Sequence, residues 1–274
     1  MRTFAERRRV AILLTVLAAL VVLAFYWARA HSLNRTAFFT GWLLLSVMMV
    51  LTAYNLRKKL SFLPILRSAT WLQIHLYLGL LTIPMFLAHT GFRVPNGGLE
   101  TLLTVLFILV VGSGLVGIFI TRSFPRRLAV CDEELMFERM PIYRRNLHEA
   151  AQKLVLESVA ETGTTTIADY YRNRLNQYFA GFRNYWFHLV ESKRPRHNYE
   201  TEFGDLDRYL NDREKELAGQ LAQLVYVKDE LDYQRALQGT LKGWLFVHIA
   251  VTYSLLTCVV AHVIIVHAFM GRMP

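Results

Sequence analysis

The chain has 274 residues, of which 54% are hydrophobic and 19% are charged, and its mean hydropathy is +0.27. This composition lies outside the usual soluble range and favours a multi-spanning membrane protein. The formal net charge of +10 does not indicate nucleic-acid binding, because no soluble module with interleaved basic and aromatic residues accompanies it.

Five apolar segments are each long enough to cross a hydrocarbon core, which takes about 20 helical residues. The first follows a basic N-terminus, as a signal peptide does, but its apolar part exceeds the roughly 7–15 residues of a signal-peptide core. We therefore expect an all-α, multi-spanning transmembrane bundle of five helices. The predicted spans are Val10–Ala28, Ala37–Leu56, Leu72–Thr90, Leu102–Thr121 and Leu241–Phe269.

Basic residues are distributed unevenly between the two sides of this bundle. They cluster before the first span, between the second and third spans, and after the fourth, while the opposite loops contain few. Because cytoplasmic loops carry the excess of Lys and Arg, the N-terminus is predicted in the cytoplasm and the C-terminus outside. We expect an integral protein of a bacterial inner membrane, in contact with membrane lipid.

The segment between the fourth and fifth spans is charged and helical in periodicity, so residues 122–240 are predicted to form a cytoplasmic helical insertion. The other predicted regions are 1–121, with four spans, and 241–274, with the last span and a short outer tail. Residues 193–205 are predicted to form a loop. After it, leucines recur every seven residues, which is typical of a helix packed on a neighbour, and no Pro or turn interrupts the chain before the fifth span. These leucines are Leu210, Leu217, Leu224 and Leu231.

Several kinds of site are excluded by the sequence. Cys131 and Cys258 are the two cysteines, so there is no C-x-x-C-H motif for covalent haem and no pair of C-x-x-C motifs for zinc or iron–sulfur clusters. Nucleotide-binding and hydrolase motifs are also missing. His148, His188 and His197 lack metal-ligand spacing, and we interpret them as surface or packing residues.

Four histidines occur within the third and fifth spans at the same spacing. His75 and His89 are 14 residues apart, as are His248 and His262. On an α-helix this spacing corresponds to about 21 Å along the axis and returns to within about 40° of the starting direction. Each span therefore presents two imidazoles on one face at two depths. His267 falls about 100° off this face, and His31 has no partner at its level.

The third and fifth spans both run from the cytoplasm to the outside, so His75 is predicted level with His248, and His89 level with His262. Neutral imidazole donates a nitrogen lone pair to haem iron, and two axial ligands leave no open position, which favours electron transfer. Ligation also satisfies a ring that lipid would otherwise penalise. The sequence therefore predicts two b-type haems, each held between two histidines, with Gly79 and Gly243 leaving room for a macrocycle.

With these two H-x13-H spans and the small-residue segment Gly112–Phe119 between them, the third to fifth spans resemble the bis-haem membrane cytochromes b, including quinol-complex cytochrome b and ferric-reductase-like proteins. The resemblance implies a helical bundle that moves electrons across the bilayer. The flavin and nicotinamide domain of the ferric-reductase-like enzymes and a P-E-W-Y quinol motif are both missing. Donor and acceptor therefore stay open.

Because the chain has no flavin, cluster or nucleotide site, we expect an electron-transfer subunit that works with other redox subunits of a complex, or with a quinone. Arg93 at the outer side, and Lys242 and Arg126 at the inner side, are candidate neighbours of haem propionates by level and charge. Two alternatives stay open. One is a membrane scaffold or transporter whose histidines conduct protons or bind metal, and the other is a stand-alone reductase of a small acceptor.

Overall fold

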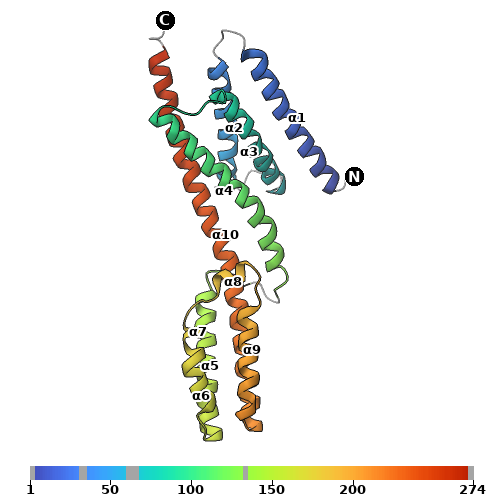
Figure 1. Ribbon diagram of the computed structural model, residues 1–274, viewed down its shortest axis with the longest axis vertical. Coiled ribbons are helices and arrows are strands. Elements are labelled where there is room, and N and C mark those ends of the chain that lie inside the picture. Colours follow the sequence, from blue (N-terminus) through green and yellow to red (C-terminus); the bar gives the residue numbers. More distant parts are fainter. Residues whose placement is uncertain (1–3, 31–35, 60–67, 132–134, 271–274) are drawn as a thin grey trace. The chain divides into compact units, whose positions relative to one another are not determined.

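The computed structural model describes residues 4–30, 36–59, 68–131 and 135–270 (Figure 1). Within these residues every regular element is helical, as the composition and periodicity predict. A π-helical turn, 171–175, joins α6 to α7, and a 3-10 turn, 207–209, follows α9. The α-helices are α1 (Phe4–Ala30), α2 (Thr36–Lys59), α3 (Ser68–Thr90), α4 (Gly98–Leu128), α5 (Met140–Thr162), α6 (Thr166–Tyr170), α7 (Asn176–Ala180), α8 (Tyr185–Leu189), α9 (Arg194–Leu206) and α10 (Asp212–Met270).

Five of these helices are long and apolar enough to cross a membrane, namely α1, α2, α3, α4 and α10. The 59 residues of α10 measure about 88 Å at about 1.5 Å per residue, far more than a hydrocarbon core of about 30 Å. Only its apolar C-terminal part, Leu241–Phe269, therefore has the composition and length of a span. The sequence correctly predicts that this helix begins well before the span and continues into it without a break.

The chain divides into two compact units. The first, which we call the histidine unit, comprises residues 1–119 and 245–274, and the second, the insertion unit, comprises residues 120–244. α4 and α10 contribute to both units because each helix crosses a boundary between them.

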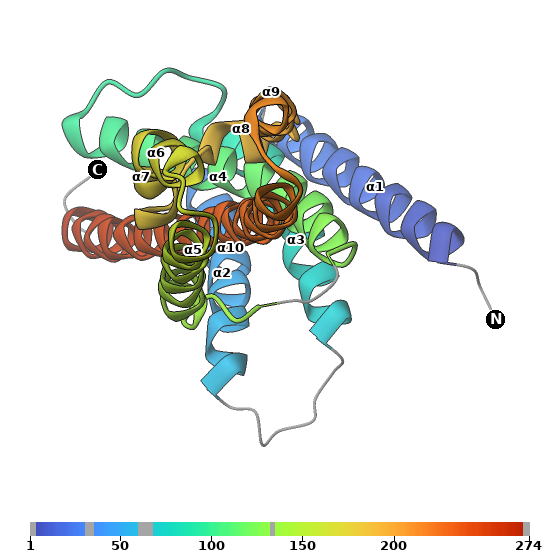
Figure 2. The same cartoon turned by 90° about the horizontal axis from the view of Figure 1, so that it is seen from below.

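In the histidine unit, α3 lies between α1 and α2 and packs closely against both (Figure 1, Figure 2). A stacked ring pair, Phe86 and Phe107 with centroids 4.1 Å apart, joins α3 to α4. Successive helices alternate in direction, and α3 runs the same way as the C-terminal part of α10 (Figure 1). α10 is not among the helices that pack closely on α3, so side chains rather than backbones meet between these two helices.

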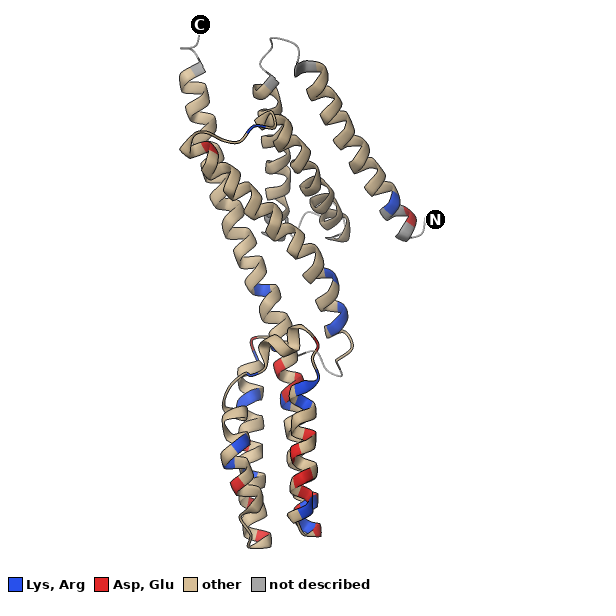
Figure 3. Ribbon diagram, in the orientation of Figure 1, with Lys and Arg blue, Asp and Glu red and all other residues tan. Residues whose placement is uncertain are grey.

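The insertion unit has its own apolar core, which α5, α6, α7 and α10 build around Leu175, Phe179 and Leu221. The leucines predicted to form a seam are buried at Leu210, Leu217 and Leu231, and Leu224 packs against the same core. Charged residues gather on α5, on α9 and on the first part of α10 (Figure 3). This distribution agrees with the composition change along the sequence.

The predicted loop at 193–205 is wrong, because Arg194–Leu206 is helix α9. Its proline, Pro195, lies in the first turn, where a missing N–H costs no hydrogen bond. Tyr199, Phe203 and Leu206 recur at helical spacing and pack against the core of the insertion unit. This apolar stripe is short and is diluted by charged residues, so the segment resembles a loop in composition.

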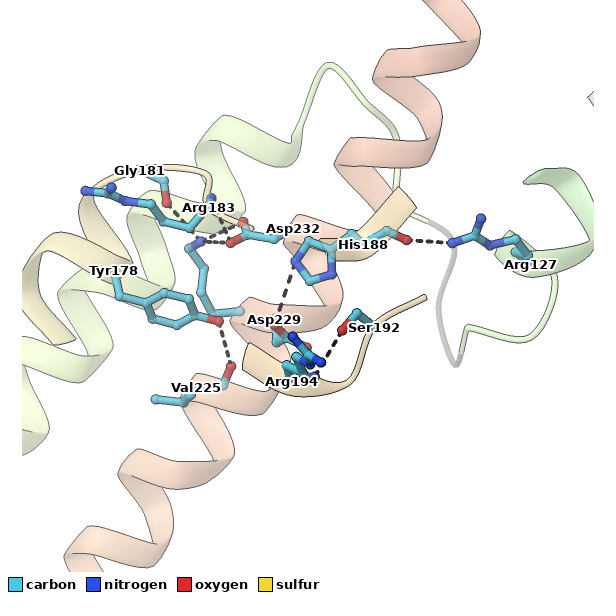
Figure 4. Close-up of polar contacts among 11 residues, drawn as sticks. Arg127, Tyr178, Gly181, Arg183, His188, Ser192, Arg194, Val225, Asp229 and Asp232 are labelled. Atoms are coloured by element: carbon cyan, nitrogen blue, oxygen red, sulfur yellow. Dashed lines mark hydrogen bonds and ion pairs between the residues drawn. The ribbon is translucent and has the colours of Figure 1, made fainter. Parts of the chain in front are cut away.

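A buried ion pair fastens the loop after α7 to α10 (Figure 4). Lys228 and Asp232 are both fully buried, with Nζ 2.6 Å from the carboxylate. Lys228 also donates to the Gly181 carbonyl at 3.0 Å, and the Arg183 backbone N–H donates to Asp232 at 3.1 Å. Burial raises the pKa of Asp232 to about 6, although the ammonium opposes this shift. The pair therefore stabilises the loop only while both partners are present.

Candidate functional site

The four histidines of the repeated spacing meet in two pairs within the histidine unit. The ring centroids of His75 and His248 lie 6.4 Å apart, and those of His89 and His262 also lie 6.4 Å apart. His75 and His248 are each the first histidine of their span, and His89 and His262 are each the second. The two segments are therefore parallel, and the juxtaposition predicted from spacing and topology is present at both levels.

The separation within each pair matches that of two imidazoles bound to one metal. Two metal–nitrogen bonds of about 2.0 Å, extended by roughly 1.1 Å from each nitrogen to its ring centre, separate the ring centres by about 6.2 Å. The ring planes are nearly perpendicular, at 80° and 86°, so the rings do not stack on each other. Each pair would therefore suit a metal-centred group held by one imidazole from α3 and one from α10.

α2 holds the ring of His89. Nδ1 of His89 lies 3.0 Å from the Ala37 carbonyl oxygen and 3.5 Å from the Thr40 hydroxyl. Because a carbonyl only accepts, Nδ1 carries the proton and Nε2 carries the lone pair. A Cβ on Gly41 would lie 2.8 Å from Cε1 of His89. The helix therefore both selects the tautomer and leaves room for the ring.

α4 performs the corresponding role for His248. Nδ1 of His248 lies 2.7 Å from the Ser113 hydroxyl oxygen, and that hydroxyl lies 2.9 Å from the Val110 carbonyl, to which it donates. Since Ser113 has one hydroxyl proton and gives it to Val110, it accepts from Nδ1 of His248. The lone pair of His248 is then on Nε2, the tautomer required of a metal ligand oriented by a second contact.

Two aromatic side chains lie close to His75. The Tyr54 ring centroid is 5.1 Å from that of His75, and Trp71 precedes it by one helical turn on α3. Nδ1 of His75 and Nε1 of Trp71 are buried and have no hydrogen-bond partner of normal geometry. The Leu51 backbone carbonyl on α2 also interacts with this ring, so His75 has both aromatic and polar neighbours.

Gly79, Gly243, Arg93, Lys242 and Arg126 complete the set of predicted site residues. A Cβ on Gly79 or Gly243 would meet nothing within 4 Å, so both positions border open space. Lys242 forms an ion pair with Glu138 and lies over the Phe137 ring, both in the insertion unit. Arg93 and Arg126 are exposed. The propionate contacts stay predictions for these three cations.

The other histidines behave as packing or surface residues. His267 lies off the ring pairs, beside Phe38 and Trp42 on α2, as helical geometry predicts. His188 is buried in the insertion unit and His197 is exposed, while His148 packs near Phe179. His31 lies outside the described residues.

Within the described residues, no group of three or more His, Cys, Asp or Glu side chains is placed to hold a metal ion. No family model, curated protein or solved structure matches this chain. The geometry of the two pairs therefore carries the functional argument.

Sequence reasoning identified the four paired histidines but not the residues that orient them. Ala37, Thr40 and Gly41 lie in the first turns of the predicted span Ala37–Leu56, and Ser113 belongs to the small-residue segment Gly112–Phe119, which entered only as part of the resemblance. A serine or threonine within a span is the only signal that the sequence offers here, since such a hydroxyl must find a partner inside the membrane.

Proposed function

We propose that this protein is the membrane-embedded, dihaem b-type cytochrome subunit of a larger redox complex. His75 with His248, and His89 with His262, would each hold one non-covalent haem. The observation that carries this proposal is the pair of equal separations, 6.4 Å at each of two levels. Electrons would cross between the two sides of the membrane through these levels.

The contacts around the rings support ligation over proton conduction. A proton relay needs rings that can exchange both nitrogen positions, whereas the Ala37 carbonyl fixes the proton of His89 on Nδ1. The Ser113 hydroxyl lies 2.7 Å from Nδ1 of His248 and donates to the Val110 carbonyl, which favours the same tautomer. Fixed tautomers with Nε2 lone pairs are what axial ligation requires. A bound haem supplies one-electron redox chemistry at an iron without an open coordination position.

The proposal implies partners, because the chain offers no group that could originate electrons. Other subunits or a membrane quinone would deliver and remove them on the two sides. The cytoplasmic face would be that of the insertion unit, where Arg122, Arg126 and Arg127 lie in the last turns of α4, as the positive-inside rule requires. The membrane would be a bacterial inner membrane, with the N-terminus inside and the C-terminus outside.

Purification of the full chain from a haem-producing host tests the proposal. We expect two equivalents of b-type haem per polypeptide in a pyridine haemochrome assay, released by acid extraction because they are not covalently bound. We also expect a reduced spectrum typical of six-coordinate haem, unchanged by carbon monoxide. A colourless preparation from a host that loads other b-type cytochromes would contradict it.

A further inference from the structure

Exposed apolar side chains gather on α8 of the insertion unit. Trp186 and Val190 are 75% and 74% exposed, and the flanking Tyr185 and Phe187 are 42% and 43% exposed. Soluble surfaces rarely carry so many contiguous large apolar side chains without a partner. A short segment of this composition needs a specific surface to cover it.

The position of α8 along α10 indicates which surface this is. The Tyr185 hydroxyl lies 2.7 Å from the Thr240 hydroxyl, and Thr240 directly precedes the apolar section that begins at Leu241. Leu189, at the end of α8, packs with Leu241 against the same cluster of buried residues. α8 is therefore fixed at the turn of α10 where polar sequence gives way to membrane-length apolar sequence.

The end of α4 meets α8 at the same place. Arg127 donates hydrogen bonds to the carbonyls of His188 at 2.6 Å and Leu189 at 2.9 Å (Figure 4). Arg127 lies in the last turn of α4, directly after its apolar section. α8 thus lies at the level where two membrane-length helices both reach their polar ends.

A second segment is held at this level with an exposed apolar side chain. The Leu135 backbone N–H donates to Gln234 at 3.0 Å, and the Gln238 side chain donates to the Leu135 carbonyl at 2.9 Å. The next residue, Met136, is 63% exposed. The apolar band, which we define as Met136, Tyr185, Trp186, Phe187 and Val190, therefore comes from two segments that α10 holds in register.

We propose that this apolar band inserts into the headgroup region of the bilayer and fixes the depth of the insertion unit at the membrane surface. Tyr and Trp favour this region because their rings are apolar and their O–H and N–H groups reach water. Exposed cations in the last two turns of α4, Arg122 and Arg126, match the charge of anionic headgroups. The band requires α4 and α10 to cross the membrane, but it does not require haem.

The test places a fluorescent label at the band in the full-length protein. In a Cys131→Ser, Cys258→Ser background, Trp186→Cys carries an environment-sensitive NBD group, and the protein is reconstituted in nanodiscs of phosphatidylcholine with phosphatidylglycerol. Val190→Cys provides a second label position should the first variant fold poorly. Leu156→Cys is the control, because Leu156 is 71% exposed on α5 and outside the band.

We expect blue-shifted emission at 186 and 190, and quenching by lipids with a spin label near the headgroup that is several-fold stronger than at 156. Water-like emission at both positions, with quenching equal to that at 156, would overturn the proposal. Blue-shifted emission without lipid quenching would also overturn it, because a second copy of the chain would then cover the band. Circular dichroism establishes that each variant is folded.

Discussion

The hydroxyl of Ser113 lies 2.7 Å from Nδ1 of His248, from which it accepts a hydrogen bond while it donates its own hydrogen bond to the Val110 carbonyl. One small side chain on α4 therefore decides which nitrogen of a ring on α10 is available to a metal. The adjacent Gly114 also borders this ring, because a Cβ there would be in ordinary van der Waals contact with Cε1 of His248, at 3.8 Å.

Replacement of this hydroxyl tests its role. Ser113→Ala is expected to weaken haem retention between His75 and His248 by about ten- to a hundredfold, the usual effect of removing an outer-shell partner of a ligand. Transfer of haem to haem-free myoglobin measures retention. Ser254→Ala is the matched control, since Ser254 on α10 donates to the Ala250 carbonyl one turn earlier on its own helix. Equal transfer from both variants would rule out an orienting role for Ser113.

A methyl group at position 41 is expected to displace His89. Gly41→Ala would place a Cβ 2.8 Å from Cε1 of that ring, closer than side-chain atoms tolerate, so the ring or α2 must move. We expect haem content to fall from two equivalents to one. Gly112→Ala provides the control, because a Cβ there meets nothing within 4 Å and alanine favours the helix. Retention of both haems in Gly41→Ala would show that His89 does not need its observed position.

The pairing of the four histidines could be predicted from the sequence, because it depends only on the helical period and on the direction of the two helices. Equal 14-residue spacings on two parallel spans determine which rings can meet. Ser113 and Gly41 were not predictable, because their roles depend on how α4 and α2 pack around rings that are far away in sequence. The error at α9 has a different cause. The spacing of Tyr199, Phe203 and Leu206 indicates a helix only when the core that they cover is known.

Loss of one partner of the buried ion pair is expected to destabilise the insertion unit. Asp232→Ala leaves the Lys228 ammonium buried without its carboxylate, which typically costs about 3 to 5 kcal/mol. The double variant Lys228→Met, Asp232→Leu removes both charges and should regain most of this free energy. Thermal unfolding followed by circular dichroism compares them. A double variant no more stable than Asp232→Ala would contradict this explanation.

His188 predicts a pH dependence of stability. Burial, helped by the charge of Lys228, lowers the pKa of His188 to about 4 from an ordinary value of 6.5. Because the folded-state pKa is the lower one, the unfolded chain binds more protons between these values. Stability is therefore complete above pH 6.5 and falls as the pH decreases towards 4, by up to about 3 kcal/mol.

The carboxyls of Asp229 and Asp232 near His188 also have shifted pKa values, so the pH dependence must be compared with that of a variant. Burial raises the pKa of Asp229 and of Asp232, which produces the opposite slope. Subtracting the unfolding curves of His188→Gln from those of the parent isolates the histidine. We expect the difference in transition temperature to shrink steadily from pH 7 to pH 4. A difference that is constant over this range would refute the assignment.

The most direct test of the central claim is the haem stoichiometry of single-histidine variants of the full chain. We predict one haem per polypeptide for His75→Ala or His248→Ala, one for His89→Ala or His262→Ala, and none when one ring of each pair is replaced. His267→Ala should keep both haems, because His267 packs on Phe38 and Trp42. Two haems retained by any of the four paired-histidine variants would contradict the account.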